Sequence, residues 1–142
     1  MISFDTNLLL YAQGARFPEH AAAREFLEGL APRIDIVVCE LVLVELYLLL
    51  RNPTIFSKPL TSVRAVEVCQ TYRTNPNWRL VEHAPVMEEV WLGVQEKSFA
   101  RRRIIDLRLA RTLQHHGVTE FATANIKDFR GLGFANVWNP LA

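Results

Sequence analysis

Three acidic residues of the chain, Asp5, Glu45 and Asp106, lie in or beside apolar stretches where a carboxylate has no polar surface to occupy. Burying a carboxylate without a partner is costly, so each of the three is expected to meet a cation. Two of them have a simpler alternative: Asp5 could cap the helix that follows it, and Asp106 could complement the dipole of its own helix. Glu45, inside a leucine-rich helix, has neither alternative. The set therefore favours one shared site.

The strands and helices expected around these acids allow all three side chains to reach one shared site. Asp5 follows the apolar run 2–4, which is typical of a strand, so it lies at the carboxyl end of that strand. At helical spacing Glu45 shares its face with leucines, which predicts an inward-pointing side chain. Asp106 is expected to point inward as well, because the residues on its helical face are Leu109, Ala110 and Leu113.

Such a group of acids suits one kind of chemistry. Carboxylates at one site repel one another, which raises their pKa values unless a divalent cation neutralises them. Because no His or Cys stands in a ligand-like spacing, the oxygen ligands predict a hard ion, Mg²⁺ or Mn²⁺, and not Zn²⁺. An ion of this type activates water and stabilises the negative charge that develops on a phosphodiester under attack. The acids therefore indicate metal-assisted phosphodiester hydrolysis.

Length and composition are those of an ordinary globular protein. The chain has 142 residues, of which 50% are hydrophobic and 22% charged, and this predicts a single domain over 1–142. The longest apolar run is interrupted by Glu45 and is too short to span a membrane, and the first residues lack the basic stretch of an export signal. Cys39 and Cys69 form no CxxC motif and are expected to be reduced thiols. A cytoplasmic location is the simplest expectation.

Apolar periodicity and turn residues predict alternating strands and helices. The expected strands are 2–4, 34–38, 79–82, 121–123 and 136–138, and the expected helices are 19–30, 41–51, 61–72, 86–99 and 106–116, the last closed by Gly117. Alternation of this kind predicts an α/β fold, a three-layer α/β/α sandwich with a central, mostly parallel sheet. Ligands of such folds bind outside the carboxyl ends of the strands, where Asp5 and the segment 123–125 are expected.

Five short motifs in this order resemble those of PIN-domain proteins. They are Asp5-Thr6-Asn7, Val44-Glu45-Leu46-Tyr47, Ile105-Asp106-Leu107, Gly117-Val118 and Thr123-Ala124-Asn125-Ile126-Lys127-Asp128-Phe129. Each motif is weak alone, whereas the ordered set is specific and covers nearly the whole chain, from Ile2 to Pro140. The chain is most similar to the VapC-type toxins of bacterial and archaeal toxin–antitoxin pairs.

The resemblance implies roles for individual residues. The acids that hold the metal in the family match Asp5, Glu45 and Asp106, directly or through water. The fourth family position matches Asn125, whose amide would position water or phosphate without adding negative charge, and Thr123 matches a hydroxyl that orients this corner.

Four further polar residues have structural roles in this interpretation. Thr6 and Asn7 are expected to shape the turn after the first acid, and Asp128 is expected to cap or pin its loop instead of touching metal. Glu40 competes with Glu45, but its place at a strand-to-helix junction favours an acid at a helix N-terminus.

The activity that the resemblance implies is that of a Mg²⁺- or Mn²⁺-dependent endoribonuclease. Its substrate would be a structured RNA such as tRNA or rRNA, and its partners a second copy of the chain in a homodimer and a small VapB-like antitoxin lying across the acidic groove. An alternative is a catalytically weak or inactive PIN domain that binds RNA or protein, and Asn125 is the only hint of it. A phosphatase with Asp5 as nucleophile is disfavoured, because Asn7 stands where a second acid would be needed.

The sequence also suggests roles for the basic and aromatic residues. The net charge is only +1, yet cations cluster around Asp106 and near the last motif, at Lys97, Arg101, Arg102, Arg103, Arg108, Arg111, Lys127 and Arg130. The run 101–103 is a candidate phosphate track, whereas Arg108 and Arg111 are expected on a plain solvated face. His115 and His116 are expected to be exposed, and Trp78, Trp91 and Trp138 to be core or interface aromatics.

Overall fold

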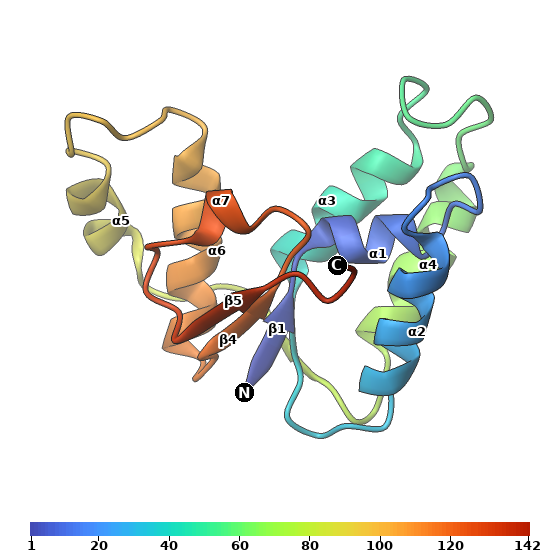
Figure 1. Ribbon diagram of the computed structural model, residues 1–142, viewed down its shortest axis with the longest axis horizontal. Coiled ribbons are helices and arrows are strands. Elements are labelled where there is room, and N and C mark those ends of the chain that lie inside the picture. The colour runs from blue at the N-terminus through green and yellow to red at the C-terminus, as the bar shows by residue number, and fades with distance from the viewer.

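The computed structural model describes residues 1–142 as short strands that alternate with helices (Figure 1). The strands are β1 Ile2–Phe4, β2 Val37–Cys39, β3 Arg79–Val81, β4 Glu120–Ala122 and β5 Asn136–Trp138. The helices are α1 Thr6–Tyr11, α2 His20–Leu30, α3 Glu40–Leu50, α4 Ser62–Arg73, α5 Met87–Gly93, α6 Arg103–His115 and α7 Ile126–Phe129.

Every strand pairing is parallel. Strands β1, β4 and β5 form one sheet in the order β1-β4-β5, β2 pairs with β3, and a parallel bridge between Ile2 and Ile36 joins the two sets. Helices α1 to α4 pack together on one side and α5 to α7 on the other (Figure 1). The predicted α/β fold with a parallel sheet is therefore confirmed.

The sheet carries the core because its central strands are apolar on both faces, as parallel strands covered by helices must be. Phe4, Val38 and Phe121 are almost completely buried, and the one polar residue of β1, Ser3, donates a hydrogen bond of 2.6 Å from Oγ to the carbonyl of Val37. Trp78 belongs to this core as predicted, and its Nε1 donates to the carbonyl of Leu30 at 3.0 Å. The parallel pairing of β1 with β4 holds the carboxyl ends of these two strands side by side.

Several predicted boundaries were wrong. The helix expected over 86–99 ends at Gly93, where the apolar period gives way to the polar stretch 95–98. The strand expected over 34–38 begins only at Val37, since Ile34 is 82% exposed. The helix of Asp106 begins one turn earlier, at Arg103, and it ends as predicted before Gly117, whose φ of +88° favours glycine.

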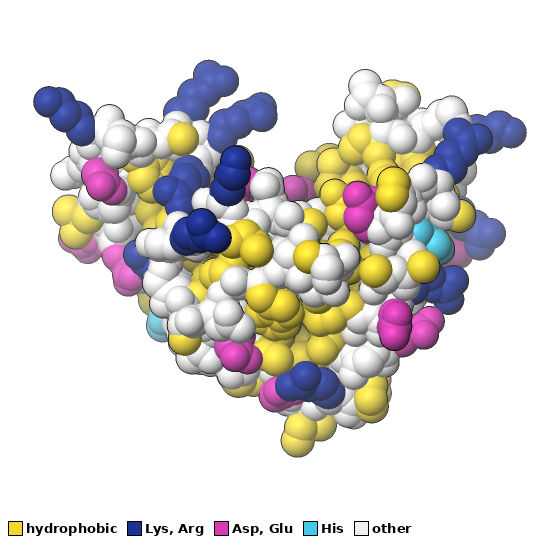
Figure 2. Space-filling model, in the orientation of Figure 1, with side chains coloured by type: hydrophobic (Ala, Val, Ile, Leu, Met, Phe, Trp, Pro, Cys, Tyr) yellow, Lys and Arg dark blue, Asp and Glu magenta, His cyan; other side chains and the backbone are white.

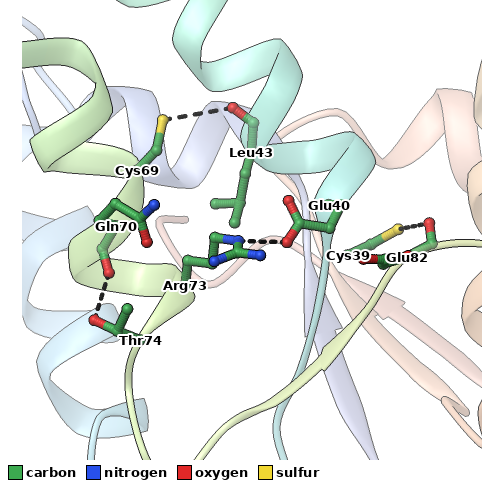
Figure 3. A network of polar contacts seen from close by, with 8 residues as sticks. All are labelled: Cys39, Glu40, Leu43, Cys69, Gln70, Arg73, Thr74 and Glu82. Atoms are coloured by element: carbon green, nitrogen blue, oxygen red, sulfur yellow. Dashed lines mark hydrogen bonds and ion pairs between the residues drawn. The ribbon is translucent and has the colours of Figure 1, made fainter. Parts of the chain in front are cut away.

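A polar network fixes helix α3 against α4 (Figure 3). Arg73 Nε donates to Glu40 Oε1 at 2.5 Å, and Cys69 Sγ donates to the carbonyl of Leu43 at 3.5 Å. Glu40 therefore has the structural place at a helix N-terminus that its position predicts. Both cysteines are free thiols, also as predicted. None of the helices is long and apolar enough to cross a bilayer.

Candidate active site

Asp5 stands where β1 ends, and both of its carboxylate oxygens are held. Oδ1 accepts a hydrogen bond of 2.8 Å from the backbone N–H of Thr6, so that Asp5 caps helix α1. Oδ2 accepts one of 2.8 Å from Thr123 Oγ1. Asp5 is therefore a helix cap, one of the two explanations considered for it, and its carboxylate is also oriented by the end of a second strand.

Thr123 forms hydrogen bonds to Asp5, Asn125 and Trp138. It is completely buried directly after β4, and its N–H donates to the carbonyl of Trp138 at 2.9 Å. Its hydroxyl donates to Asp5 and accepts from the N–H of Asn125 at 2.9 Å. The position of the Asp5 carboxylate therefore depends on the register of the β1, β4 and β5 strands.

Glu45 does not point into the core, and this prediction was wrong. The residue is exposed, and so are its helical neighbours Val44 (56%) and Leu48 (62%). Helix α3 packs through a different set of side chains, Val42, Leu43, Leu46 and Leu50, so that its other apolar residues remain outside. The Glu45 carboxylate nevertheless reaches α1, where Oε2 accepts from Thr6 Oγ1 at 3.3 Å.

Negative charge gathers around Asp5 and Asp106. Burial raises the pKa of Asp5 to about 6, against the hydrogen bonds from Thr123 and Thr6 and with added repulsion from Glu45 and Asp128. Burial, followed by repulsion from Asp5, Asp128 and Glu45, raises the pKa of Asp106 to about 7. The three predicted acids therefore lie within electrostatic range of one another, although they come from distant parts of the chain.

The cluster contains a fourth acid, Asp128, which the sequence analysis assigned to the loop alone. Asp128 does hold its loop, because its Oδ2 accepts from Asn125 Nδ2 at 2.5 Å. Its charge also acts on both Asp5 and Asp106. Asn125 is exposed, and one N–H of its amide makes this contact. The spacing of Asn125 and Asp128, three residues apart just beyond a strand, was the available signal.

The donor chemistry of the site fits a hard divalent ion. No group of three His, Cys, Asp or Glu side chains is arranged as a ready metal cage. Mg²⁺, however, keeps several waters and is commonly held by one or two carboxylates, so it does not require a closed cage. Burial is the main cause of the raised pKa values of Asp5 and Asp106, repulsion among the acids adds to it, and at Asp106 the positive charge of Arg103 acts in the opposite direction. A cation between these residues would compensate their negative charges.

Several cations surround the acids, and one of them, Arg103, is close enough for its charge to lower the pKa of Asp106. Figure 2 shows Lys and Arg side chains gathered at the raised parts of the molecule on both sides of a central hollow. On the α5–α7 side the exposed cations without an ion pair are Lys97, Arg101, Arg102, Arg108, Lys127 and Arg130. Arg111, expected on a plain solvated face, instead pairs with Glu89 at 3.3 Å and donates to the carbonyl of Leu132. Arg108 is exposed as expected.

Comparison with known proteins agrees with this architecture. The chain is 57% identical over 141 residues to two proteins named Ribonuclease VapC24, from the CDC 1551 and H37Rv strains of Mycobacterium tuberculosis. The match covers 99% of this chain and 97% of each relative. It confirms the prediction that the chain is an enzyme of the nuclease class. The model of the PIN domain family matches residues 2–134, and the chain therefore belongs to the PIN domain family.

Proposed function

We propose that this protein is a Mg²⁺- or Mn²⁺-dependent endoribonuclease, acting as the toxin of a toxin–antitoxin pair on a structured RNA such as tRNA or rRNA. The convergence of four acids at the carboxyl end of a parallel sheet carries the proposal. The name of the relatives, Ribonuclease VapC24, supports RNA as the substrate, and PIN nucleases generally use a divalent metal ion. The whole chain, 1–142, acts as one domain in this proposal.

Each residue of the site has a task in the proposed reaction. Asp5, Glu45 and Asp106 hold the ion, directly or through water. When bound, the ion makes water a better nucleophile and stabilises the negative charge on the phosphodiester. Asp128 supplies the fourth carboxylate, and the amide of Asn125 orients Asp128 and contacts water or phosphate. Thr123 keeps the Asp5 carboxylate pointed at the others.

Incubation with RNA tests the proposal. The purified protein is expected to cut total tRNA or rRNA when Mn²⁺ or Mg²⁺ is present, leaving 5′-phosphate and 3′-hydroxyl ends. EDTA should stop cleavage and added Mn²⁺ should restore it, because the acids alone repel the phosphate. Cleavage that continues unchanged in EDTA, or no cleavage of any RNA with Mn²⁺, would contradict the proposal.

Arg101 and Arg102 are proposed phosphate contacts, since both are exposed, unpaired and adjacent to the helix that carries Asp106. Changing both to Gln is expected to raise KM for RNA by about tenfold, leave kcat unchanged and weaken the salt dependence of binding. The measurement is steady-state cleavage at two salt concentrations. Arg24→Gln, on the distant helix α2 and paired with Glu28, is the matched control and should behave as wild type.

A small VapB-like antitoxin is the proposed inhibitor, with its C-terminal segment across the acidic groove and an Arg directed at the carboxylates. A separate cavity of about 620 Å³ lies beyond the end of α1, lined by Phe17, Phe56, Leu60 and other residues, and none of the four acids of the cluster lines it. Co-expression with the neighbouring small open reading frame is the direct measurement.

The chain is also proposed to form a homodimer through helix α3. Val44 and Leu48, four residues apart on one face of α3, are exposed, and covering such an apolar stripe stabilises an interface. Leu48→Glu is expected to convert a dimer into a monomer in size-exclusion chromatography with light scattering. Ile34→Glu, at an 82% exposed position outside the helices, should remain dimeric. A wild-type protein that is monomeric at all concentrations would exclude this interface.

A further inference from the structure

We propose that Arg103 is a positioning residue of the active site: its guanidinium holds helix α7 against α6 and so fixes where Asp128 stands relative to Asp5 and Asp106. The kinetic part of this inference rests on the proposed nuclease function. The structural part does not, because it concerns contacts within the chain.

The contacts of Arg103 differ from those of its neighbours. Arg101 and Arg102 are exposed, whereas Arg103, the first residue of α6, is partly buried. Its Nη2 donates to the carbonyl of Arg130 at 2.7 Å, and its Nε donates to the carbonyl of Asp128 at 3.3 Å. A planar guanidinium can donate to two acceptors at once in a fixed fork, and the point charge of a lysine cannot reproduce that geometry.

Helix α7 depends on such a contact because it is a single turn, Ile126–Phe129, and an isolated turn is unstable in water. The chain becomes extended at Arg130, so no backbone N–H reaches the carbonyls of Asp128 and Arg130. Phe129 anchors one side of the turn by packing on Phe121 of β4, with ring centroids 4.5 Å apart. Arg103 satisfies both free carbonyls and fixes the other side.

This arrangement joins two acids of the cluster through one helical turn. Arg103 and Asp106 are three residues apart at the start of α6, so they lie on the same side of that helix. Arg103 donates a hydrogen bond to the carbonyl of Asp128 in α7, while Asp106 belongs to the acid cluster. Loss of Arg103 would therefore let Asp128 move away from Asp106. It would also remove a positive charge that acts on Asp106, and Arg103→Lys, which keeps a charge, separates the two effects.

Variants at neighbouring positions separate positioning from phosphate binding. Arg103→Met is expected to lower kcat for RNA by about 10- to 100-fold with KM nearly unchanged, as found when groups that orient metal ligands are removed. Arg103→Lys keeps the charge but not the fork and should also lower kcat. Arg102→Met should instead raise KM and leave kcat intact. If Arg103→Met raises only KM, Arg103 is a phosphate contact and the inference is wrong.

Amide hydrogen exchange provides a readout that needs no substrate. In Arg103→Met the amides of residues 126–130 are expected to exchange faster, while those of β1 and β4 keep their protection. In Arg103→Lys, which keeps a positive charge beside Asp106, binding of Mn²⁺ alone, followed by electron paramagnetic resonance, should weaken by about tenfold. Unchanged exchange over 126–130, or unchanged Mn²⁺ affinity and kcat, would overturn the inference. A wild type that cuts no RNA would refute the proposed function, and exchange would still decide the role of Arg103.

Discussion

Replacing Asp106 with asparagine is expected to lower kcat/KM for RNA by about 10³-fold or more, which corresponds to about 4 kcal/mol of transition-state stabilisation. Asparagine has nearly the same shape, so α6 and its packing should persist, while the negative charge that attracts a divalent ion is lost. The substitution also removes a group that repels Asp5 and Glu45. Activity and stability should therefore move in opposite directions.

The measurement is steady-state cleavage with Mn²⁺, together with calorimetric titration of Mn²⁺ and thermal unfolding in EDTA. Asp5→Asn should reproduce the loss, since asparagine can still accept the hydrogen bond from Thr6 as a helix cap. Asp35→Asn is the control, because Asp35 is paired with Arg33 away from the cluster and should leave kcat/KM unchanged. Wild-type cleavage by either cluster variant would remove the acids from the mechanism.

The metal-free protein is expected to become less stable as the pH rises from about 4 to about 7. The pKa of Asp5 in the folded protein is about 6, above its ordinary value of 3.8. Between these values the folded state binds more protons than the unfolded state, so the free energy of unfolding falls as pH increases. The contribution of Asp5 is fully present below its unfolded pKa, is lost as the pH passes the folded pKa, and amounts to about 3 kcal/mol at most.

Urea unfolding in EDTA at about pH 5 and about pH 7.5 measures this difference. Asp106 acts in the same direction, since its pKa is also raised, to about 7. Asp5→Asn should flatten the dependence, and Mn²⁺ should stabilise the wild type most at the higher pH, where the acids are ionised. If Asp5→Asn keeps the full pH dependence, the burial of the Asp5 carboxylate is not its source.

The parts of the site that the sequence predicted are those attached to regular, apolar strands. The run 2–4 predicts both β1 and the place of Asp5 at its end, and the segment 121–123 does the same for Thr123. Parallel pairing then brings these two ends together, which accounts for the hydrogen bond between residues 118 positions apart. Strand ends are predictable because the pairing pattern leaves them little freedom.

The wrong predictions concern side chains whose orientation is set by tertiary packing and not by the local sequence pattern. In α3 nearly every residue is apolar, so periodicity could not show which face meets α1 and α4, and Glu45 was assigned to the wrong side. Helix α7 is a single turn with no measurable period, so the orientation of Asp128 could not be predicted. Arg111 was misassigned because its acceptor, the carbonyl of Leu132, lies in a turn far along the chain.

The pairing of β1 with β4 has a consequence for synthesis in the cell. The ribosome synthesises the N-terminus first. Strand β1 (Ile2–Phe4) therefore cannot pair until its partner strand β4 (Glu120–Ala122) has left the ribosome. The hydroxyl of Thr123, which aims the Asp5 carboxylate, emerges directly afterwards, and Asp128 follows it. A growing polypeptide therefore carries Asp5 and Glu45 before the strand pairing and the Thr123 hydroxyl that orient Asp5 exist, and the acid cluster can form only after Asp128 has been synthesised.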